Sequence, residues 1–260
     1  MKITWYGTAS VLLEAAGERI LFDPFVQIRG GENPNSLDDF AGEKYICVTH
    51  GHLDHLMEVT EFLDRESLVE ATVYCGSVAA NTLEEQGMDC SNVVLVCPGM
   101  QWRIGKMQIA VLNAKHSVPG PGLSFRTICS FRMLKYFWNA IFLASVNKQF
   151  PEGGETFLYE VTAEGKRIQI MGSLGLDEKE NYQTGADLLV LPFQGTGHLE
   201  QKAIEIVERL QPKRVMLDHF DDAIPPVSHS VDTRKFKKLM DQKYPAVQVV
   251  KPTAGKALEI

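Results

Sequence analysis

The sequence predicts an α/β protein whose sheets are covered by helices, and three observations support this fold class. Short β-type runs separated by turns fill most of the chain, and helical spacing of apolar residues appears in a few segments between them. No linker, internal repeat or low-complexity tract divides the 260 residues. We therefore predict a single domain over residues 1–260, with a hydrophobic insert at about 118–156.

The predicted strands are runs of apolar, β-branched and aromatic residues bounded by turn-forming residues. In chain order they are Ile3–Tyr6, Ser10–Glu14, Arg19–Asp23, Tyr45–Thr49, Thr72–Cys75, Val93–Val96, Gln108–Leu112, Phe157–Val161, Ile168–Met171, Leu188–Leu191, Arg214–Leu217 and Val247–Val250. A hairpin turn at Ala16–Glu18 is expected between the second and third strands. Tyr45–Thr49 is a continuous apolar run, which is typical of a fully buried strand. The last two strands are expected to pair and to close the chain.

Helical spacing is visible in two segments. Ser77–Gln86 shows it moderately. A second segment shows it clearly, with apolar residues three and four apart and Pro212 as the stop signal; these residues are Ala203, Ile204, Val207 and Leu210. We expect these helices to cover the sheets.

Composition excludes several classes of protein. Hydrophobic residues make up 45% and charged residues 23%, close to the globular average, which excludes a disordered, collagen-like or coiled-coil chain. Lys and Arg number 26 against 33 Asp and Glu, and the resulting net charge of −7 argues against a nucleic-acid partner.

The sequence favours a cytoplasmic protein. Its first residues lack the apolar stretch of a signal peptide, and the longest apolar region, Tyr136–Val146, is too short for a transmembrane segment. The cysteines number five and form no C-x-x-C pair. They are therefore predicted to be reduced thiols rather than a disulfide framework or a zinc knuckle.

The chemistry is concentrated in one short segment, Thr49–His55, which reads T-H-G-H-L-D-H. Three of the seven histidines fall within six residues, with an Asp among them. Imidazole nitrogens and a carboxylate suit zinc, and also iron or manganese, so the motif predicts a metal site without choosing the metal. The alternative is a His-rich surface loop. Because the segment follows a buried strand, a tight turn can direct several of its side chains into one cavity.

This motif after a hydrophobic strand resembles the signature of the metallo-β-lactamase superfamily of metal-dependent hydrolases. The similarity covers most of the chain, and Trp5–Ser10 followed by Ile20–Pro24 resembles the opening of the branch that contains ascorbate-6-phosphate lactonase. Asn113–Ser117 and Val215–Phe220 resemble the strand ends that supply two further histidines. The resemblance implies a four-layered αβ/βα sandwich with a metal cleft between its two sheets.

The resemblance also implies a ligand set. One site would comprise His50, His52 and His116, which leaves a position open for water, as a catalytic zinc requires. A second site beside it would comprise Asp54, His55 and His219. Asp23 would support a ligand histidine by hydrogen bonding, although its position before Pro24 also suits a simple turn. His198 and His229 are expected at the surface near the mouth of the site.

One departure from the family pattern concerns the second site. Most members carry Gly-Asp after the strand that matches Arg167–Met171, and that Asp bridges two metals. This chain has Ser173 there, and a neutral hydroxyl is a poor substitute for a carboxylate. We therefore expect one or two ions, zinc above all, with a weaker second site that Ser173 contacts only weakly.

These residues predict an enzyme. A metal-bound water has its pKa lowered to about 7, and the resulting hydroxide would cleave a small-molecule ester, lactone or phosphodiester. Asp54 is placed both to bind metal and to accept a proton, which makes it the predicted catalytic residue. The alternatives are a metal-binding or sensing domain that has lost catalysis and, with less support, a metallo-ribonuclease, which the charge and the absence of RNA-binding segments disfavour.

The insert is rich in aromatic residues, with basic residues interleaved. Residues 125–146 could line a pocket for an apolar or amphipathic acyl substrate or dip into a membrane surface. A core helix or the interface of a homo-oligomer is the favoured interpretation.

Overall fold

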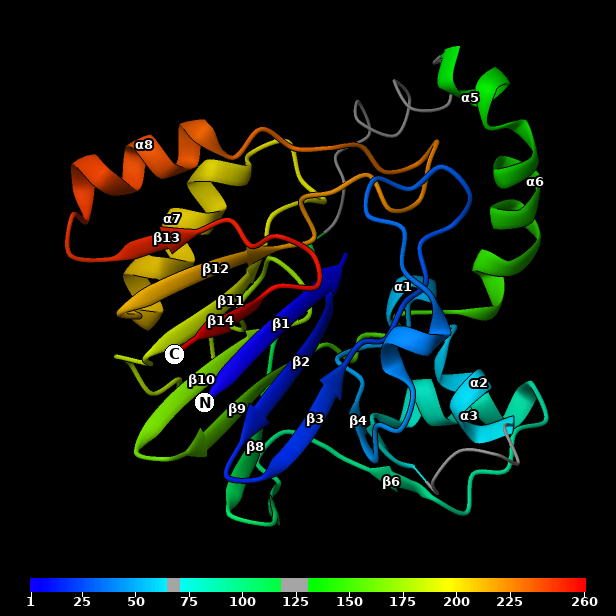
Figure 1. The fold of residues 1–260 in the computed structure, drawn as a ribbon, viewed down its shortest axis with the longest axis horizontal. Coiled ribbons are helices and arrows are strands. Elements are labelled where there is room, and N and C mark those ends of the chain that lie inside the picture. Colours follow the sequence, from blue (N-terminus) through cyan, green and yellow to red (C-terminus); the bar gives the residue numbers. More distant parts are fainter. Residues whose placement is uncertain (65–70, 118–130) are drawn as a thin grey trace.

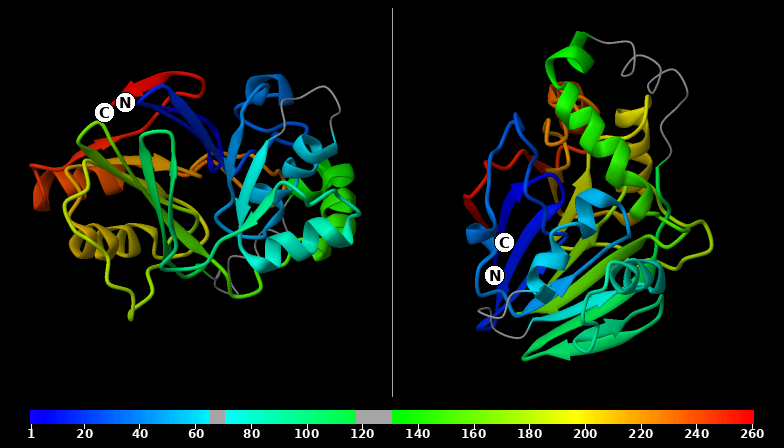
Figure 2. Two further views of the ribbon diagram at one scale, coloured as in Figure 1. Left: turned by 90° about the horizontal axis from the view of Figure 1, so that it is seen from below. Right: turned by 90° about the vertical axis from the view of Figure 1, so that its right-hand side faces the viewer.

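Two seven-stranded mixed sheets pack face to face in the computed structural model, which describes residues 1–64, 71–117 and 131–260. Helices cover the outer side of each sheet, and the two layers of strands between them are seen edge-on in Figure 2. This arrangement is the four-layered αβ/βα sandwich, so the predicted fold class is confirmed.

The first sheet contains most of the N-terminal half of the chain (Figure 1). In spatial order it comprises β14 (Ala257–Glu259), β1 (Lys2–Gly7), β2 (Ser10–Ala15), β3 (Glu18–Phe22), β4 (Tyr45–Cys47), β5 (Thr72–Cys75) and β6 (Val93–Leu95). The pairs from β14 to β3 are antiparallel, and those from β3 to β6 are parallel. The parallel part therefore aligns the ends of β3 and β4, after which Asp23 and the histidine motif begin.

The second sheet is built from the later strands. In spatial order it comprises β13 (Gln248–Val250), β12 (Arg214–Asp218), β11 (Leu188–Pro192), β10 (Lys166–Met171), β9 (Phe157–Ala163), β8 (Met107–Asn113) and β7 (Gln101–Ile104). Strands β7 to β10 are antiparallel, and β10 to β13 are parallel.

The helices are short and cover the two sheets unevenly. They are α1 (Leu53–Leu56), α2 (Val59–Asp64), α3 (Ser77–Glu85), α5 (Phe131–Lys135), α6 (Phe137–Val146), α7 (Leu199–Leu210) and α8 (Arg234–Lys243), with 3-10 turns η1 (Leu37–Phe40) and η2 (Asn147–Gln149). Helices α7 and α8 lie together beside the second sheet, and α1 to α3 lie beside the first (Figures 1 and 2). Within the described ranges no helix has the length and apolarity that a bilayer span requires.

Alternating side chains of the first sheet enter two different cores. Val11 and Leu13 point into the core between the sheets, which extends to α7 and α8, whereas Leu12 points to the core under α1 to α3. All three side chains are at most 2% exposed. Because the side-chain direction alternates along a strand, a sheet that is covered on both faces must be apolar at successive positions, as β2 is.

Every predicted strand has a counterpart in the structure, and both predicted helices are present as α3 and α7. Strands β7 and β14 and helix α8 were not predicted, and β14 rather than β13 ends the sheet structure. The short β14 depends on pairing with β1 at the other end of the chain, which no local pattern shows. Helix α8 did leave a signal, since its two buried residues, Phe236 and Met240, are four positions apart.

The predicted insert is described only from residue 131 onward, so 118–130 lie outside the described residues. Of the two favoured interpretations, the core helix is wrong for the described part, and the oligomer interface stays a prediction. In α5 and α6 only Leu143 is buried, and the two helices stand apart from the sheets at the edge of the molecule (Figure 1). Few residues of α6 are buried because the tertiary structure places this helix over a cavity, described below, and not against a sheet.

Candidate metal centre

Four segments of the chain bring the six predicted ligand residues to one end of the sandwich. The loop after β4 and the short helix α1 supply four of them, the chain after β8 supplies one, and the residue after β12 supplies the last. They form two groups that could each hold a metal ion, His50 with His52 and His116, and Asp54 with His55 and His219. The ligand atoms of each group lie within 4.8 Å of one another.

The first group consists of three imidazoles. His50 Nε2 lies 3.1 Å from His52 Nδ1, and the rings of His52 and His116 have centroids 4.5 Å apart. Burial lowers the pKa of all three residues, well below the usual range for His50 and to about 4 for His116. Neutral imidazoles carry the free lone pair that a metal requires, so this donor set fits zinc without any proton having to be released.

The second group is held by a carboxylate. Asp54 Oδ2 lies 3.0 Å from His219 Nε2 and 3.7 Å from His55 Nε2. Burial raises the pKa of Asp54, but His55 and His219 outweigh this effect and hold it well below its usual range. Burial lowers the pKa of His219, yet its hydrogen bond with Asp54 raises it to about 9. A carboxylate and two imidazoles suit a divalent cation, which would take the place of the proton that His219 carries at neutral pH.

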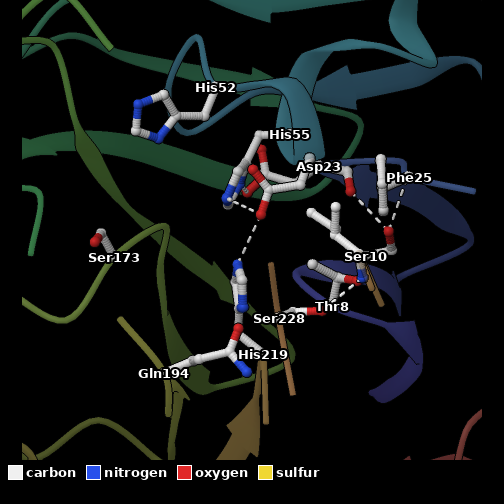
Figure 3. A network of polar contacts seen from close by, with 12 residues as sticks. Thr8, Ser10, Asp23, Phe25, His52, His55, Ser173, Gln194, His219 and Ser228 are labelled. Atoms are coloured by element: carbon white, nitrogen blue, oxygen red, sulfur yellow. Dashed lines mark hydrogen bonds and ion pairs between the residues drawn. The ribbon is translucent and has the colours of Figure 1, made fainter. Parts of the chain in front are cut away.

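Asp23 and Thr49 together make polar contacts with histidines of both ligand groups. The Asp23 carboxylate accepts hydrogen bonds from the backbone N–H and the hydroxyl of Thr49, both at 2.7 Å, and lies 2.8 Å from His55 Nδ1. Thr49 Oγ1 in turn lies 3.1 Å from His50 Nδ1 and 3.2 Å from His55 Nδ1. Figure 3 shows Asp23 beside His55, with His219 pointing toward this group from the opposite direction. Such partners fix the tautomer and orientation of a ligand imidazole.

Two of these residues adopt left-handed backbone conformations, which cost energy in a residue that has a Cβ. Asp23 has φ +46° and His219 has φ +53°. Each is held by a backbone hydrogen bond: the Asp23 N–H donates to Cys47 O of the adjacent strand β4 at 3.1 Å, and the His219 N–H donates to Thr8 O, in the turn between β1 and β2 of the other sheet, at 2.7 Å. These hydrogen bonds hold both turns in place, so the Asp23 side chain stays at the end of β3 and the His219 side chain at the end of β12.

Ser173 lies beside the centre, on the side away from Asp23 (Figure 3). Its hydroxyl accepts a hydrogen bond from the Ser117 backbone N–H at 3.0 Å and lies 3.3 Å from the Ser117 hydroxyl. The preceding residue is glycine because a Cβ on Gly172 would collide with the Thr49 side chain. The end of β10 can therefore approach the metal centre closely, but it brings a hydroxyl there rather than a carboxylate.

The centre forms the base of a cavity of about 770 Å³. Helices α5 and α6 with η2 form one wall, and the loop 224–229 forms another. The lining residues outside the ligand set include Met133, Ala140, Leu143, Ala144, Lys148, Gln194, Ile224, Pro226, Val227 and His229. A concave site of this volume that opens on a candidate metal centre has the size expected for a small-molecule ligand.

Sequence reasoning located the six candidate ligands and Asp23 but missed several neighbours. It did not single out Thr49, whose place at the start of the histidine motif was the available signal. His229 was expected near the mouth of the site, but the rest of the loop 224–229 was not assigned to it, because only the tertiary fold brings that loop beside α6. His198 is exposed as expected, whereas the exposed His229 also lines the cavity.

A family profile described as a beta-lactamase superfamily domain matches residues 2–218. The chain belongs to the beta-lactamase superfamily. The matched region contains five of the six candidate ligands and ends one residue before His219. The prediction of a metal-dependent hydrolase of this superfamily is thus confirmed at the level of the family.

Two relatives are similar to this chain over nearly the whole length of both proteins. A UPF0173 metal-dependent hydrolase of Methylacidiphilum infernorum is 27% identical over 91% of this chain and 92% of its own, and one of Pyrococcus furiosus is 26% identical over the full length of both. Among solved structures, Igni18, a metallo hydrolase of Ignicoccus hospitalis, has a TM-score of 0.64 at 18% identity and covers 100% of this chain and 98% of its own. The finer resemblance, to the branch of ascorbate-6-phosphate lactonase, stays a prediction.

Proposed function

We propose that this superfamily member hydrolyses a small-molecule carboxylic ester or lactone at the two ligand groups. The observation that carries this proposal is the opening of both groups into one cavity of about 770 Å³. Esters and lactones place a single polarised carbonyl at the reacting end of the molecule, which suits a cavity whose lining combines the candidate ligands with many apolar side chains.

We propose His50, His52 and His116 as ligands of one zinc ion, and Asp54, His55 and His219 as ligands of a second. Bound divalent cations would generate a nucleophile from water at neutral pH and polarise the substrate oxygen that gains charge. Asp54 would bind metal through one oxygen and accept a proton through the other. Asp23 would hold His55 in the tautomer whose Nε2 faces Asp54.

The proposed reaction balances as a simple hydrolysis. The oxygen of water forms a bond to the acyl carbon, and the bond from that carbon to the alkoxy oxygen breaks. Asp54 accepts a proton of the water and passes it to the departing oxygen, which leaves as an alcohol or, from a lactone, as the hydroxyl of the same product. The other proton is released to solution, and the acid product is a carboxylate.

A phosphodiester is the second candidate substrate. The observation in its favour is Lys148 in the cavity lining, since a lysine can bind a phosphate oxygen as a point charge. Two adjacent metal groups also suit a phosphoryl centre, because they can stabilise both the attacking and the leaving oxygen.

We further propose that the protein is cytoplasmic and that a second copy of the chain covers α5 and α6. The cysteines among the described residues, Cys47, Cys75, Cys90 and Cys97, form no disulfide, which suits a reducing compartment; Cys129 lies outside the described residues. Large apolar side chains are exposed along the two helices, namely Phe131, Leu134, Phe137, Trp138, Ile141 and Phe142. Their exposed surface amounts to roughly 700 Å², close to what one partner contributes to a stable interface.

Charge favours a second copy over an anionic membrane as the partner of this face. Helix α6 contains no charged residue, so two copies can meet there without repulsion. Arg132 is paired with Asp222 at 2.6 Å, which leaves Lys135 as the cation without a carboxylate partner on α5 and α6. A net charge of −7 also opposes binding to an anionic lipid surface.

Turnover of p-nitrophenyl acetate and bis-p-nitrophenyl phosphate by the zinc-loaded protein tests the proposed function. We expect ester hydrolysis that His52→Ala abolishes and that His198→Ala, a change at an exposed histidine outside the site, leaves intact. Tight zinc binding without turnover of either compound would contradict the proposal and favour a metal-binding or sensing domain. Turnover of the phosphodiester alone would favour the second candidate.

A further inference from the structure

The cavity residues of helix α6 and of the loop 224–228 are mostly apolar, and we call the part of the cavity that they line the slot. Helix α6 presents Ala140, Leu143 and Ala144 to it, and α5 adds Met133. The loop opposite adds Ile224, Pro226 and Val227. Helix α6 therefore has two different faces, one that lines the slot and one that carries the exposed Trp138 and Ile141.

Hydrogen bonds from polar side chains hold the slot in shape. The Asn139 carboxamide donates to Arg29 O at 2.8 Å and to Pro225 O at 2.9 Å, which fastens α6 to the opposite loop. Arg132 donates to Asp222 at 2.6 Å and to Ser228 O at 3.1 Å, which fastens α5 to the same loop. The two walls are thus connected to each other independently of the metal centre.

The polar group on the loop wall already has partners. The Ser228 hydroxyl donates to Asp222 Oδ1 at 2.9 Å and accepts the Ile224 N–H at 2.6 Å. The Ser228 hydroxyl therefore has its donor engaged. The other polar lining residues of these walls, Asn147, Lys148 and His229, lie outside the stretch between Leu143, Ala144 and Ile224. A polar ligand group in that stretch would lose its hydration on entering. An apolar chain loses nothing there and gains the free energy of leaving water.

The charges of the lining restrict the ligand further. Among the described residues that line the cavity, Asp54 has the only carboxylate and Lys148 is the only lysine. Asp54 belongs to the metal centre. A cationic ligand would therefore meet no carboxylate that is free to pair with it. An uncharged or anionic ligand meets no repulsion from the walls.

We propose that the substrate is an uncharged or anionic ester or lactone with an extended apolar acyl chain that lies between α6 and the loop 224–228. This inference rests on the proposed function, because it places the reacting carbonyl at the metal centre. The chain then points away from the metals along Leu143 and Ala144, and the slot selects acyl groups by length.

Hydrolysis of p-nitrophenyl esters from acetate to decanoate by the zinc-loaded full chain tests the proposal, since only the acyl length changes across the series. We expect kcat/KM to rise roughly fourfold per methylene until the slot is filled. Ala144→Trp places an indole in the slot and should lower the ratio of octanoate to acetate turnover at least tenfold. Gln149→Trp adds the same ring at an exposed position outside the lining and should leave that ratio unchanged. A series without length dependence, or an equal loss for all esters in Ala144→Trp, would overturn the proposal.

A binding measurement separates this proposal from the proposed function. Decanoate, the product of the longest ester, should bind to the protein in a calorimetric titration even if no ester is hydrolysed. Its affinity should fall at least tenfold in Ala144→Trp and stay unchanged in Gln149→Trp. Decanoate binding without turnover would contradict the proposed reaction while supporting the apolar slot, and absence of decanoate binding would overturn the slot itself.

Discussion

At the scale of single residues, the hydrogen-bond partners of each polar side chain determine how well each side of the metal centre is supported. Asp23 is 1% exposed and makes three short polar contacts, with two groups of Thr49 and with His55. Ser173 is 5% exposed, and its hydroxyl is engaged by Ser117. The side of the centre beside Asp23 is thus rigidly supported, whereas the side beside Ser173 lacks an anionic ligand.

Ser173→Asp should strengthen metal binding by the second group. The new carboxylate would supply the anionic oxygen that the hydroxyl cannot, so a variant dialysed against zinc and then desalted should retain nearly two ions per chain. The unmutated protein and Ser173→Ala should each retain one tightly held ion. Metal analysis of the three proteins checks this, and two tightly held ions in the unmutated protein would contradict the weaker second site.

Glu58 gives the stability of the fold a dependence on pH. It is 6% exposed, and burial raises its pKa to about 8, an effect that hydrogen bonds from the backbone of Val26 and of Glu58 itself only partly offset. Because the folded-state pKa exceeds the unfolded one, the stability contribution is complete below about pH 4.5 and is lost as the pH rises through about 8.

Glu58→Gln should therefore be more stable than the unmutated protein at pH 8, with a difference that shrinks toward pH 5. The slope should reach up to about 1.4 kcal/mol per pH unit between these values. Urea unfolding at several pH values measures it, and Glu85→Gln, at an exposed position on α3, serves as the control. A difference that does not change with pH would show that the Glu58 carboxyl is not forced to be neutral.

At the scale of elements, the strands could be predicted from the sequence, but the role of the insert as a wall of the cavity could not. Apolar runs such as Leu188–Leu191 report burial on both faces, which is a local property of the sequence. The histidine motif was likewise local, whereas His116 and His219 could be assigned only through the family resemblance. The surroundings of helix α6 could not be predicted from its own residues. Its residues are apolar nearly all round, and the fold decides that Leu143 lines a cavity while Trp138 faces outward.

At the scale of the whole molecule, both sheets of the sandwich contribute ligand residues to the metal centre. The first sheet supplies the histidine motif and the second supplies His116 and His219, so the two ligand groups form only when the sheets pack. The single domain predicted over residues 1–260 accords with this dependence and stays a prediction. The exposed apolar face of α5 and α6 belongs to the same two helices whose other side chains line the shared cavity.

Trp138→Glu should convert a dimer into a monomer, because the charge would be buried without a partner at the centre of the proposed interface. Light scattering after gel filtration gives the mass in solution. Leu95→Glu makes the same kind of change at a distant apolar residue that is 56% exposed and should leave the mass unchanged. A monomeric unmutated protein would contradict the proposed interface.

Anomalous diffraction at the zinc absorption edge, from crystals of the zinc-loaded protein, tests the proposed metal centre directly. We expect one strong peak among the nitrogens of His50, His52 and His116 and a weaker peak beside Asp54, His55 and His219. Zinc bound elsewhere, or no peak within coordination distance of the three histidines, would contradict it.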